Sequence, residues 1–332
     1  MDATKHNETA GQAALPGNAG AQVRAADAAA IAAAAELIGT GGLVAVPTET
    51  VYGLAARADS DAAVAAIYRA KGRPDFNPLI VHVANLAAAE RLAHFDDRAR
   101  ALAARFWPGP LTMVLPRRAD AGLASAVSAG LPTVALRVPD HPVMRALLRK
   151  CGLPLAAPSA NRSGAVSPTS AAHVVASLGD RIGLVLDGGE TRAGIESTIV
   201  AIRANHGSGS GWSILRPGPI EEARISAILG PPDDVTTSGI EAPGQLASHY
   251  APGKPVRLGA EIARGDEYHI GFGAVAGDVS LSASGDLAEA AARLYACLHL
   301  AAASQRPGIA VAPVPQAGIG AAINDRLRRA AA

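Results

Sequence analysis

The sequence predicts an α/β protein with two domains, a large domain built on a twisted sheet and a smaller one after it. The chain has 332 residues, a length typical of about two domains. Apolar residues make up 49 % of the chain and charged residues 18 %, which provides for a large buried core. Short apolar runs typical of strands recur between segments with helical periodicity. These observations favour layers of helices packed on sheets.

The first domain is expected to span residues 24–220, with strands and helices in an irregular succession. The expected helices cover residues 25–38, 61–70, 97–105 and 140–150, and two more begin at Asn85 and at Ser167-Pro168-Thr169. The expected strands cover residues 43–46, 79–83, 111–115, 133–138, 153–157, 184–186, 197–202 and 213–215. Because helices and strands do not alternate strictly, a mixed, twisted sheet is favoured over a regular parallel one.

The remaining segments have a different composition. Residues 1–22 are polar and lack periodicity, so they are expected to be a disordered tail. Residues 203–211, rich in Gly and Ser, are expected to form a surface hairpin. Residues 221–253 are expected to be a linker. Residues 254–332 predict a small α/β domain with parallel strands at 256–258, 269–272 and 309–312 and helices at 286–303 and 317–331.

Charge and cysteine content exclude several classes of protein. With 30 basic and 29 acidic residues the net charge is +1, which argues against a broad nucleic-acid surface but leaves room for a local anion site. Cys151 and Cys297 lie far apart, so neither a disulfide scaffold nor a structural zinc site is expected, and a reducing compartment fits. No apolar run is long enough for a membrane span and no secretory signal is visible. We therefore expect a cytoplasmic protein.

Two polar motifs stand close to the first predicted strands. Residues 47–54, Pro-Thr-Glu-Thr-Val-Tyr-Gly-Leu, follow a buried strand, where binding loops of α/β proteins commonly lie; a plain strand-to-helix turn is the alternative. Lys71-Gly72-Arg73-Pro74 can direct two cations at one anion, although a charged surface turn would have the same sequence. His82 alternates with apolar residues on a strand, where a structural histidine is the usual case.

Further candidates lie in the second half of the first domain. Residues 157–169 form a hydroxyl- and amide-rich loop before a helix, which suits a phosphate or a nucleotide. Glu196-Ser197-Thr198 also places hydroxyl groups at a strand edge. Arg137 lies on an otherwise apolar strand and needs an anion, so it is a candidate partner for a carboxylate. No P-loop motif and no G-x-S-x-G motif is present.

The order and spacing of these motifs resemble those of the YrdC-like family. The matching segments are residues 47–54, 71–74, 158–161 and 196–198. Pro243-Gly244, His249-Tyr250-Ala251-Pro252 and residues 322–327 are similar to the longer, two-domain form of the family. The resemblance covers residues 24–331, nearly everything outside the tail.

The resemblance implies a fold and a reaction. The fold is a YrdC-like twisted sheet, mixed or mostly parallel, with a smaller Rossmann-like α/β domain at the C-terminus. The reaction makes L-threonylcarbamoyladenylate from L-threonine, bicarbonate and ATP and releases pyrophosphate. It is the first step towards threonylcarbamoyladenosine in tRNA. Mg²⁺ would accompany ATP without being tightly held by protein ligands. The implied partners are these small molecules and the downstream tRNA threonylcarbamoyl-transferase machinery, with direct tRNA binding weak or absent.

The resemblance also implies roles for individual residues. Lys71 and Arg73 would be catalytic by neutralising the ATP phosphates. The residues that would bind L-threonine are Thr50, His82, Arg137 and Ser197, with Arg137 on the carboxylate. The choice between Ser197 and Thr198 stays open, because only one of two neighbours on a strand can face the site. The residues that would line the nucleotide are Arg73, Asn77, Thr133, Ala157, Ser159, Asn161, Ser167, Arg216 and Tyr250.

The position of Tyr250 also leads to a prediction about the linker. An aromatic residue near Pro252 is of little use to a flexible spacer, and long connections in compact proteins often act as lids. We therefore expect residues 221–253 to fold over the first domain and place Tyr250 against the nucleotide. An ordinary tether with Tyr250 packed on the second domain is the alternative.

Two other function classes are alternatives to this reaction. A carbamoyl-transfer domain like that of hydrogenase-maturation proteins is disfavoured, because the acylphosphatase-like and zinc-finger regions expected there are absent. A non-catalytic RNA-binding module is disfavoured by the near-neutral charge and an aromatic content of 3 %.

Overall fold

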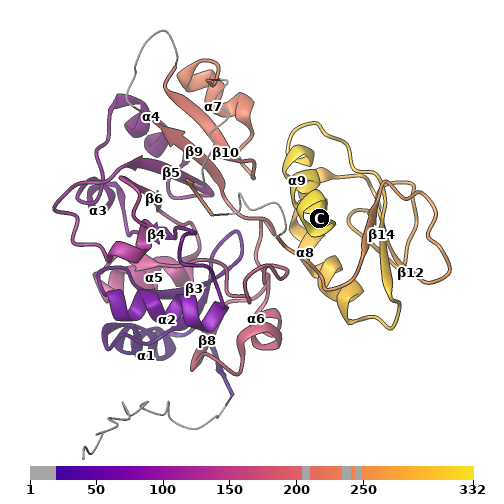
Figure 1. Ribbon diagram of the computed structural model, residues 1–332, viewed down its shortest axis with the longest axis horizontal. Coiled ribbons are helices and arrows are strands. Elements are labelled where there is room, and N and C mark those ends of the chain that lie inside the picture. Colours follow the sequence, from indigo (N-terminus) through magenta and orange to yellow (C-terminus); the bar gives the residue numbers. More distant parts are fainter. Residues whose placement is uncertain (1–19, 204–209, 234–240, 244–248) are drawn as a thin grey trace, which may run out of the picture.

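The computed structural model describes residues 20–203, 210–233, 241–243 and 249–332, which form two lobes. In Figure 1 the larger lobe carries β3 (Tyr52–Arg57), β5 (Leu111–Pro116) and β10 (Trp212–Arg216), among other elements. The smaller lobe carries β12 (Glu267–Gly271), β14 (Gly308–Val311), α8 (Leu287–Ala303) and α9 (Gly320–Ala330). This two-domain α/β architecture agrees with the prediction.

The larger lobe is built on a ten-stranded sheet with the order β1-β8-β2-β3-β7-β4-β6-β5-β9-β10. Its strands are β1 Gln22–Ala25, β2 Val44–Pro47, β3 Tyr52–Arg57, β4 Ile80–His82, β5 Leu111–Pro116, β6 Thr133–Arg137, β7 Leu155–Ala156, β8 Leu184–Asp187, β9 Thr198–Ile202 and β10 Trp212–Arg216. Within the described residues, four neighbouring pairs are parallel and five antiparallel. The mixed sheet is confirmed, with antiparallel pairs in a slight majority.

Helices cover both faces of this sheet. They are α1 Ala28–Gly39, α2 Asp61–Lys71, α3 Leu86–Glu90, α4 Asp97–Phe106, α5 Pro142–Cys151, α6 Ala171–Leu178 and α7 Glu222–Leu229. Val44 and Val46 of β2 pack in one cluster with α1 and α5, whereas Ala45 belongs to the cluster that contains residues of α2 and α4. This alternation follows from the opposite directions of successive side chains on a strand.

Local signals fix where several of these helices begin. The side chains of Ser60 and Asn85 accept hydrogen bonds from the backbone N–H groups of Ala63 and Ala88, respectively, as N-cap residues do. Helix α2 ends at Lys71 and is capped by Gly72, whose φ of 60° lies in the left-handed region that glycine adopts without a steric penalty. The turn at Gly72 leads the chain from Lys71 into the loop that carries Arg73.

Some sequence-based expectations need correction. Gln22, assigned to the tail, begins β1, which pairs with β8; residues 1–19 lie outside the described residues. Strand β3 forms within and after the polar motif at 47–54, where a loop was expected. Helix α7 occupies the first part of the predicted linker. Residues 234–240 and 244–248 of that linker lie outside the described residues, as do residues 204–209 of the expected hairpin between the antiparallel strands β9 and β10.

The smaller lobe has a four-stranded parallel sheet with the order β11-β14-β12-β13. Its strands are β11 Val256–Leu258, β12 Glu267–Gly271, β13 Val279–Ser280 and β14 Gly308–Val311, and its helices are α8 Leu287–Ala303 and α9 Gly320–Ala330. The parallel strands confirm the prediction for this domain.

The two lobes share a packed interface. Val51, Val166 and Ile195 of the larger lobe belong to the same apolar cluster as residues of α8 and α9. A Cβ atom on Gly194 would lie 2.3 Å from the carbonyl oxygen of Ala292 in α8, and the φ of Gly194 is 68°. Only glycine therefore permits this approach between the lobes.

Candidate active site

A pocket in the larger lobe lies where the turn between β2 and β3 meets loops beside β4, β7 and β9 and the end of the linker. It is lined by Thr48, Thr50, Val51, Gly53, Arg73, Ile80, His82, Arg137, Ala157, Pro158, Ser159, Glu196, Ser197, Arg216, Pro243, His249 and Tyr250. The pocket therefore brings together segments that are far apart in the sequence, including Pro243, His249 and Tyr250 from the predicted linker.

Most of the residues predicted for the substrates lie on this pocket. They are Thr50, Arg73, His82, Arg137, Ala157, Ser159, Ser197, Arg216 and Tyr250. Lys71, Asn77, Thr133, Asn161 and Ser167, which were also predicted, are not among the lining residues.

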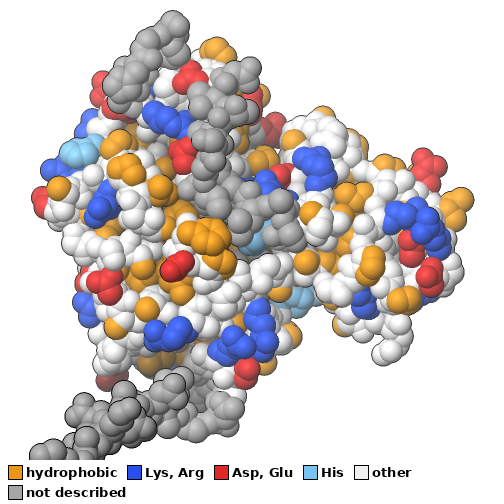
Figure 2. All heavy atoms as spheres, viewed as in Figure 1, with side chains coloured by type: hydrophobic (Ala, Val, Ile, Leu, Met, Phe, Trp, Pro, Cys, Tyr) orange, Lys and Arg blue, Asp and Glu red, His pale blue; other side chains and the backbone are white. Residues whose placement is uncertain are grey.

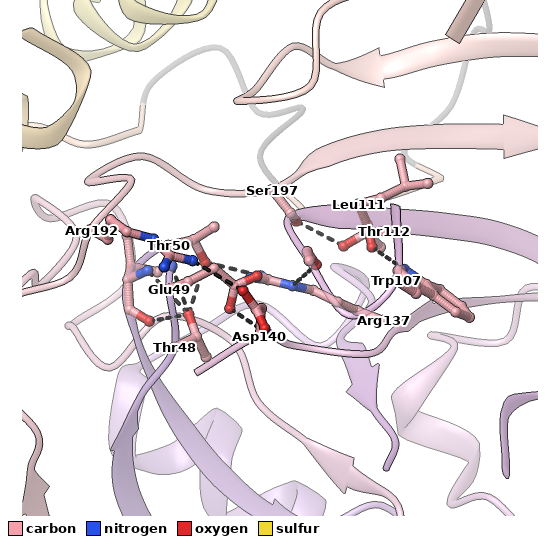
Figure 3. A network of polar contacts seen from close by, with 12 residues as sticks. Thr48, Glu49, Thr50, Trp107, Leu111, Thr112, Arg137, Asp140, Arg192 and Ser197 are labelled. Carbon is pink, nitrogen blue, oxygen red and sulfur yellow. Dashed lines mark hydrogen bonds and ion pairs between the residues drawn. The ribbon is translucent and has the colours of Figure 1, made fainter. Parts of the chain in front are cut away.

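Arg137 is held by a buried network at the end of β6. Its Nη2 donates to Glu49 Oε1 at 2.7 Å and its Nη1 to Thr50 Oγ1 at 3.0 Å. Glu49 Oε2 accepts from the backbone N–H of Asp140 at 3.0 Å. In Figure 3 Arg137 lies between this group and the pair formed by Thr112 and Ser197. Burial alone would raise the pKa of Glu49, but the charge and hydrogen bond of Arg137 outweigh it and lower that pKa.

The turn between β2 and β3 orients Thr50 towards Arg137. Thr48 Oγ1 accepts from the backbone N–H groups of Thr50 and Val51, each at 3.2 Å, and donates to the carbonyl oxygen of Val51 at 2.6 Å. The two threonine hydroxyl oxygens are 2.8 Å apart. Side-chain bonds of this kind stabilise turns in place of a backbone ladder. The Thr-Glu-Thr part of the motif is therefore a rigid support for Arg137.

Ser197, and not Thr198, faces the pocket. Ser197 Oγ lies 2.7 Å from Thr112 Oγ1 and 3.1 Å from Arg216 Nη2. Thr198 Oγ1 donates to the carbonyl oxygen of Ile220 at 2.8 Å and accepts from its N–H at 2.9 Å. The two neighbours thus point in different directions at the start of β9, as successive residues of an extended chain do.

Lys71 and Arg73 have different surroundings. Lys71 is buried, and its Nζ donates to the backbone carbonyls of Ser159 and Asn161, so it holds the loop that follows β7. Burial, followed by the charge of Arg73, lowers the pKa of Lys71 well below its ordinary value. Arg73 lines the pocket and is anchored from Nη2 to the carbonyl oxygen of Pro78 at 2.9 Å. Burial lowers the pKa of Arg73 to about 10, which leaves it charged near pH 7.

His82 lines the pocket, and both of its ring nitrogen atoms are buried. Neither ring nitrogen finds a hydrogen-bond partner among the described residues. Burial, followed by the charge of Arg137, lowers the pKa of His82 to about 3, so its ring is neutral near pH 7. A neutral imidazole offers one donor and one acceptor. Because unpartnered buried polar atoms are rare in proteins, His82 is well suited to bind a polar ligand.

The predicted residues away from the pocket have other environments. Asn77 and Asn161 are buried, and the Oδ1 atom of each lacks a partner among the described residues. Ser167 Oγ donates to Glu196 Oε1 at 2.6 Å. Thr133 begins β6, at the opposite end of that strand from Arg137, and is paired with Pro116 of β5. Their predicted roles in nucleotide binding stay predictions.

Tyr250 contacts both lobes. It is buried, lines the pocket and has a φ of 64°, an uncommon conformation for a residue with a side chain. Its ring centroid lies 5.5 Å from that of Tyr295 in α8. The next residue, Ala251, donates from its N–H to the carbonyl oxygen of Gly164 at 2.7 Å. Tyr250 thus lines the pocket, as a lid residue would, and also packs on the smaller lobe, as a tether residue would. The function of this segment as a lid stays a prediction.

Some residues that line the pocket or bond to its lining residues had no assigned role in the sequence-based prediction. Glu49 and Glu196 lie inside the recognised motifs, and His249 is next to Tyr250. Their positions in the sequence therefore indicated that they lie near the site. Thr112, which contacts Ser197, carries no comparable signal, because it lies on an apolar strand.

The described residues offer neither a cluster of metal-ligating side chains nor a membrane-spanning helix. No group of three or more His, Cys, Asp or Glu side chains gathers there as a set of metal ligands. No described helix has the length and apolar character needed to cross a membrane. On the face shown in Figure 2, basic and acidic side chains are interspersed over both lobes.

Comparisons with known proteins cover nearly the whole chain. A family model described as "Telomere recombination", which represents the Sua5, YciO and YrdC proteins, matches residues 36–218. A second, described as "Threonylcarbamoyl-AMP synthase, C-terminal domain", matches residues 220–332.

Individual relatives agree with these matches. The chain is 41 % identical to the threonylcarbamoyl-AMP synthase of Bacillus subtilis, over 91 % of this chain and 92 % of that protein. It is 37 % identical to the enzyme of the same name from Pyrococcus abyssi, over 90 % of this chain and 92 % of that protein. The crystal structure of P. abyssi Sua5 complexed with L-threonine matches with a TM-score of 0.82 and 36 % identity, covering 91 % of this chain and 94 % of that one. The chain therefore belongs to the Sua5–YciO–YrdC family, in its two-domain form.

Proposed function

We propose that this chain is an L-threonylcarbamoyladenylate synthase, which converts L-threonine, bicarbonate and ATP into threonylcarbamoyl-AMP and pyrophosphate. The names of its relatives and the threonine complex of P. abyssi Sua5 support this assignment. The observation that carries it is the composition of the pocket. Arg137, Arg73 and Arg216 line it together with the hydroxyl groups of Thr50 and Ser197, and these are the groups that one carboxylate and several phosphate oxygens require.

The reaction needs positioning more than covalent chemistry by the protein. The threonine amine attacks bicarbonate and forms a carbamate with loss of water. A carbamate oxygen then attacks the α-phosphorus of ATP, the bond between the α- and β-phosphates breaks, and pyrophosphate leaves. Fixed cations that stabilise phosphate charge in a site shielded from water contribute most to such a transfer.

Each group of residues has a proposed task. Arg137, oriented by Glu49 and Thr50, binds the threonine carboxylate, and His82 and Ser197 complete that part of the site. Arg73 and Arg216 face the phosphates. Lys71 holds the loop at 159–161 in place. It therefore contributes to nucleotide binding indirectly, through this loop. Tyr250 and the segment around it exclude water from the acyl-adenylate.

Mg²⁺ is proposed to enter as part of the substrate MgATP, where it neutralises phosphate charge. Glu196 is the acidic side chain among the described lining residues, and it is already bonded to Ser167, Tyr295 and Arg326. Within the described part of the pocket, a divalent ion would therefore take its ligands from the phosphates. The product is proposed to pass to the tRNA threonylcarbamoyl-transferase machinery of the cytoplasm.

The decisive experiment measures pyrophosphate release by the purified protein. Release is expected only when L-threonine, bicarbonate and ATP are all present, and mass spectrometry should identify threonylcarbamoyl-AMP in the same reaction. Release that continues without threonine or without bicarbonate would contradict the proposal. Arg137→Gln, which removes the proposed carboxylate partner, is expected to raise the KM for threonine more than that for ATP.

A further inference from the structure

Glu196 places a buried carboxylate in the pocket, and the smaller lobe supplies two of its partners. Oε2 accepts from the hydroxyl of Tyr295 in α8 at 2.8 Å and from Arg326 Nε in α9 at 3.0 Å. Oε1 accepts from Ser167 Oγ at 2.6 Å. Burial alone would raise the pKa of Glu196, but the charges of Arg326 and Arg216 lower it to about 2. Glu196 is therefore an anion at neutral pH, in a pocket where we propose that anions bind.

Arg326 is a fully buried cation between the two lobes. Its exposed fraction is 0 %. Besides Glu196, it donates from Nη1 to the carbonyl oxygen of Pro217 at 2.8 Å and to Asp325 Oδ2 at 2.9 Å. Its guanidinium carbon lies 5.6 Å from the centre of the Tyr250 ring, within the range of a cation–π contact. Arg326 thus joins the acidic side chain of the pocket to the aromatic residue of the linker.

Stability alone is a weak explanation for such an arrangement. Removing two charges from water is costly, and well-packed apolar residues often stabilise a protein as much as a buried ion pair does. The neighbourhood of Glu196 offers another explanation. Arg216 lines the same pocket, yet no ion pair joins it to Glu196 among the described residues. Arg216 instead donates to the carbonyl oxygen of Ser197 from Nε at 3.1 Å and from Nη2 at 3.0 Å.

We propose that Arg326 is a positioning residue for nucleotide binding. By holding the Glu196 carboxylate on the side of the smaller lobe, it keeps Arg216 available for the phosphates of a nucleoside triphosphate, and it holds Tyr250 at the pocket. The C-terminal domain then contributes directly to the affinity for the nucleotide. This inference rests on the proposed function only for the identity of that nucleotide as ATP.

Arg326→Gln tests the proposal through the affinity for ATP. In the variant, the Glu196 carboxylate keeps its hydrogen bonds to Ser167 and Tyr295 but loses its cation. It is therefore expected to turn to Arg216 and compete with the phosphates. The Kd and the KM for ATP are expected to rise about tenfold, the size expected for one charged hydrogen bond, while the Kd for threonine changes less than threefold. Arg328→Gln is the matched control, because Arg328 lies on the same helix but is exposed; it is expected to leave both constants unchanged.

A double variant separates positioning from structural support. Glu196→Gln combined with Arg326→Gln removes the charge that would occupy Arg216, so the Kd for ATP should return to within about threefold of the original value. Arg326→Lys, which keeps a cation beside Glu196, should also stay within about threefold. If Arg326→Gln does not fold, a weakening of ATP binding by about tenfold or more in Arg326→Lys overturns the proposal. A smaller folded fraction lowers kcat but changes neither Kd nor KM.

The proposal is overturned if Arg326→Gln lowers kcat with an unchanged affinity for ATP, if the double variant binds ATP no better than the single one, or if Arg326→Lys weakens binding as much as Arg326→Gln. Equilibrium binding of ATP also separates this inference from the proposed function. A protein that releases no pyrophosphate but loses ATP affinity in Arg326→Gln would contradict the proposed function and support the role of Arg326.

Discussion

Arg137 and Glu49 form an ion pair of 2.7 Å in which the exposed fractions of the two side chains are 4 % and 3 %. The charge of Arg137 is thus already balanced in the free protein, and its orientation is fixed by Thr50 as well. A carboxylate that approaches Arg137 enters a site whose cation needs no reorganisation. Such preorganisation lowers the cost of binding.

Glu49→Gln is expected to destabilise the protein and to increase its response to threonine. Removing one partner leaves a buried charge without its counter-ion, which costs about 3–5 kcal/mol of unfolding free energy when nothing replaces it. A bound threonine carboxylate would partly replace it. Thermal unfolding should therefore show a lower Tm for the variant and a larger rise in Tm at saturating threonine than in the unmodified protein.

The control for this prediction is Asp120→Asn, which removes an ion pair with Arg118 whose side chains are 39 % and 80 % exposed. A surface pair of this kind contributes about 0–1 kcal/mol, so the Tm should hardly change. An equal threonine-induced rise in Tm for Glu49→Gln and the unmodified protein would show that no carboxylate reaches Arg137.

Some elements of this fold follow from local sequence patterns, and others depend on contacts between residues that are far apart in the sequence. The helices that begin at Ser60 and Asn85 were predicted, because a capping side chain and an apolar period lie within a few residues of each other. Strand β3 was missed, because Gly53-Leu54-Ala55-Ala56-Arg57 contains no β-branched residue. Its strand conformation depends on pairing with β2 and β7, which no local pattern indicates.

In the candidate active site, too, residues in short motifs could be predicted, whereas contacts between distant residues could not. Thr50, Arg73 and Ser197 were identified because each lies in a short contiguous motif. The partner of Arg137 was not identified, since Glu49 is 88 residues away in the sequence. Arg326 is 130 residues from Glu196, and their contact exists only once the lobes have docked. Pairings of this kind follow from topology and packing, which composition and spacing do not specify.

Ser197→Ala and Thr198→Val are expected to have opposite consequences. Ser197 faces the pocket, so its loss should raise the KM for threonine about tenfold, the effect of roughly one hydrogen bond. Thr198 binds Ile220 away from the pocket, so its loss should lower the Tm and leave that KM unchanged. Steady-state kinetics and thermal unfolding of both variants test this directly. If Thr198→Val is the variant with the raised KM, the assignment of Ser197 to the pocket is wrong.

Lys71 and Arg73 are expected to differ although they lie two residues apart. Arg73→Ala should raise the KM for ATP about ten- to a hundredfold, because a charged hydrogen bond to the nucleotide is lost. Lys71→Met should also lower the Tm, because the backbone carbonyls of Ser159 and Asn161 lose their donor. If Lys71→Met keeps the original Tm and changes only the KM for ATP, then Lys71 acts on the phosphates directly.

His82 predicts how stability depends on pH. Its pKa is lowered to about 3 in the folded protein from the ordinary 6.5, so between these values the unfolded chain binds a proton that the folded protein does not. The stability that neutral His82 provides is complete above pH 6.5 and is lost as the pH falls towards 3. Each such proton changes the unfolding free energy by about 1.4 kcal/mol per pH unit.

The measurement is urea unfolding at several pH values between 6.5 and 4.5. His249 and His299, whose pKa values burial lowers to about 3 and about 4, should add to the pH dependence of the unmodified protein. His82→Gln should reduce the slope of unfolding free energy against pH by the contribution of one proton. Identical slopes would show that His82 is protonated in the folded protein.

The hydroxyl group of Tyr250 is buried and finds no hydrogen-bond partner among the described residues. A buried polar group without a partner destabilises the free protein, and a residue at positive φ adds strain. If the segment around Tyr250 is a lid, a bound nucleotide provides the missing partner. Tyr250→Phe should then keep or raise the Tm of the free protein but increase the KM for ATP several-fold, because only the complex loses a hydrogen bond.

Tyr250→Ala should have a further effect, because it removes the ring that packs on Tyr295 and Arg326 as well as the hydroxyl. Water then reaches the acyl-adenylate, so pyrophosphate release should exceed the threonylcarbamoyl-AMP recovered, whereas Tyr250→Phe should keep the two equal. Both quantities can be measured in one quenched reaction. If Tyr250→Phe has the KM of the unmodified protein and Tyr250→Ala keeps pyrophosphate and product equal, Tyr250 is part of a tether between the lobes and the segment is not a lid.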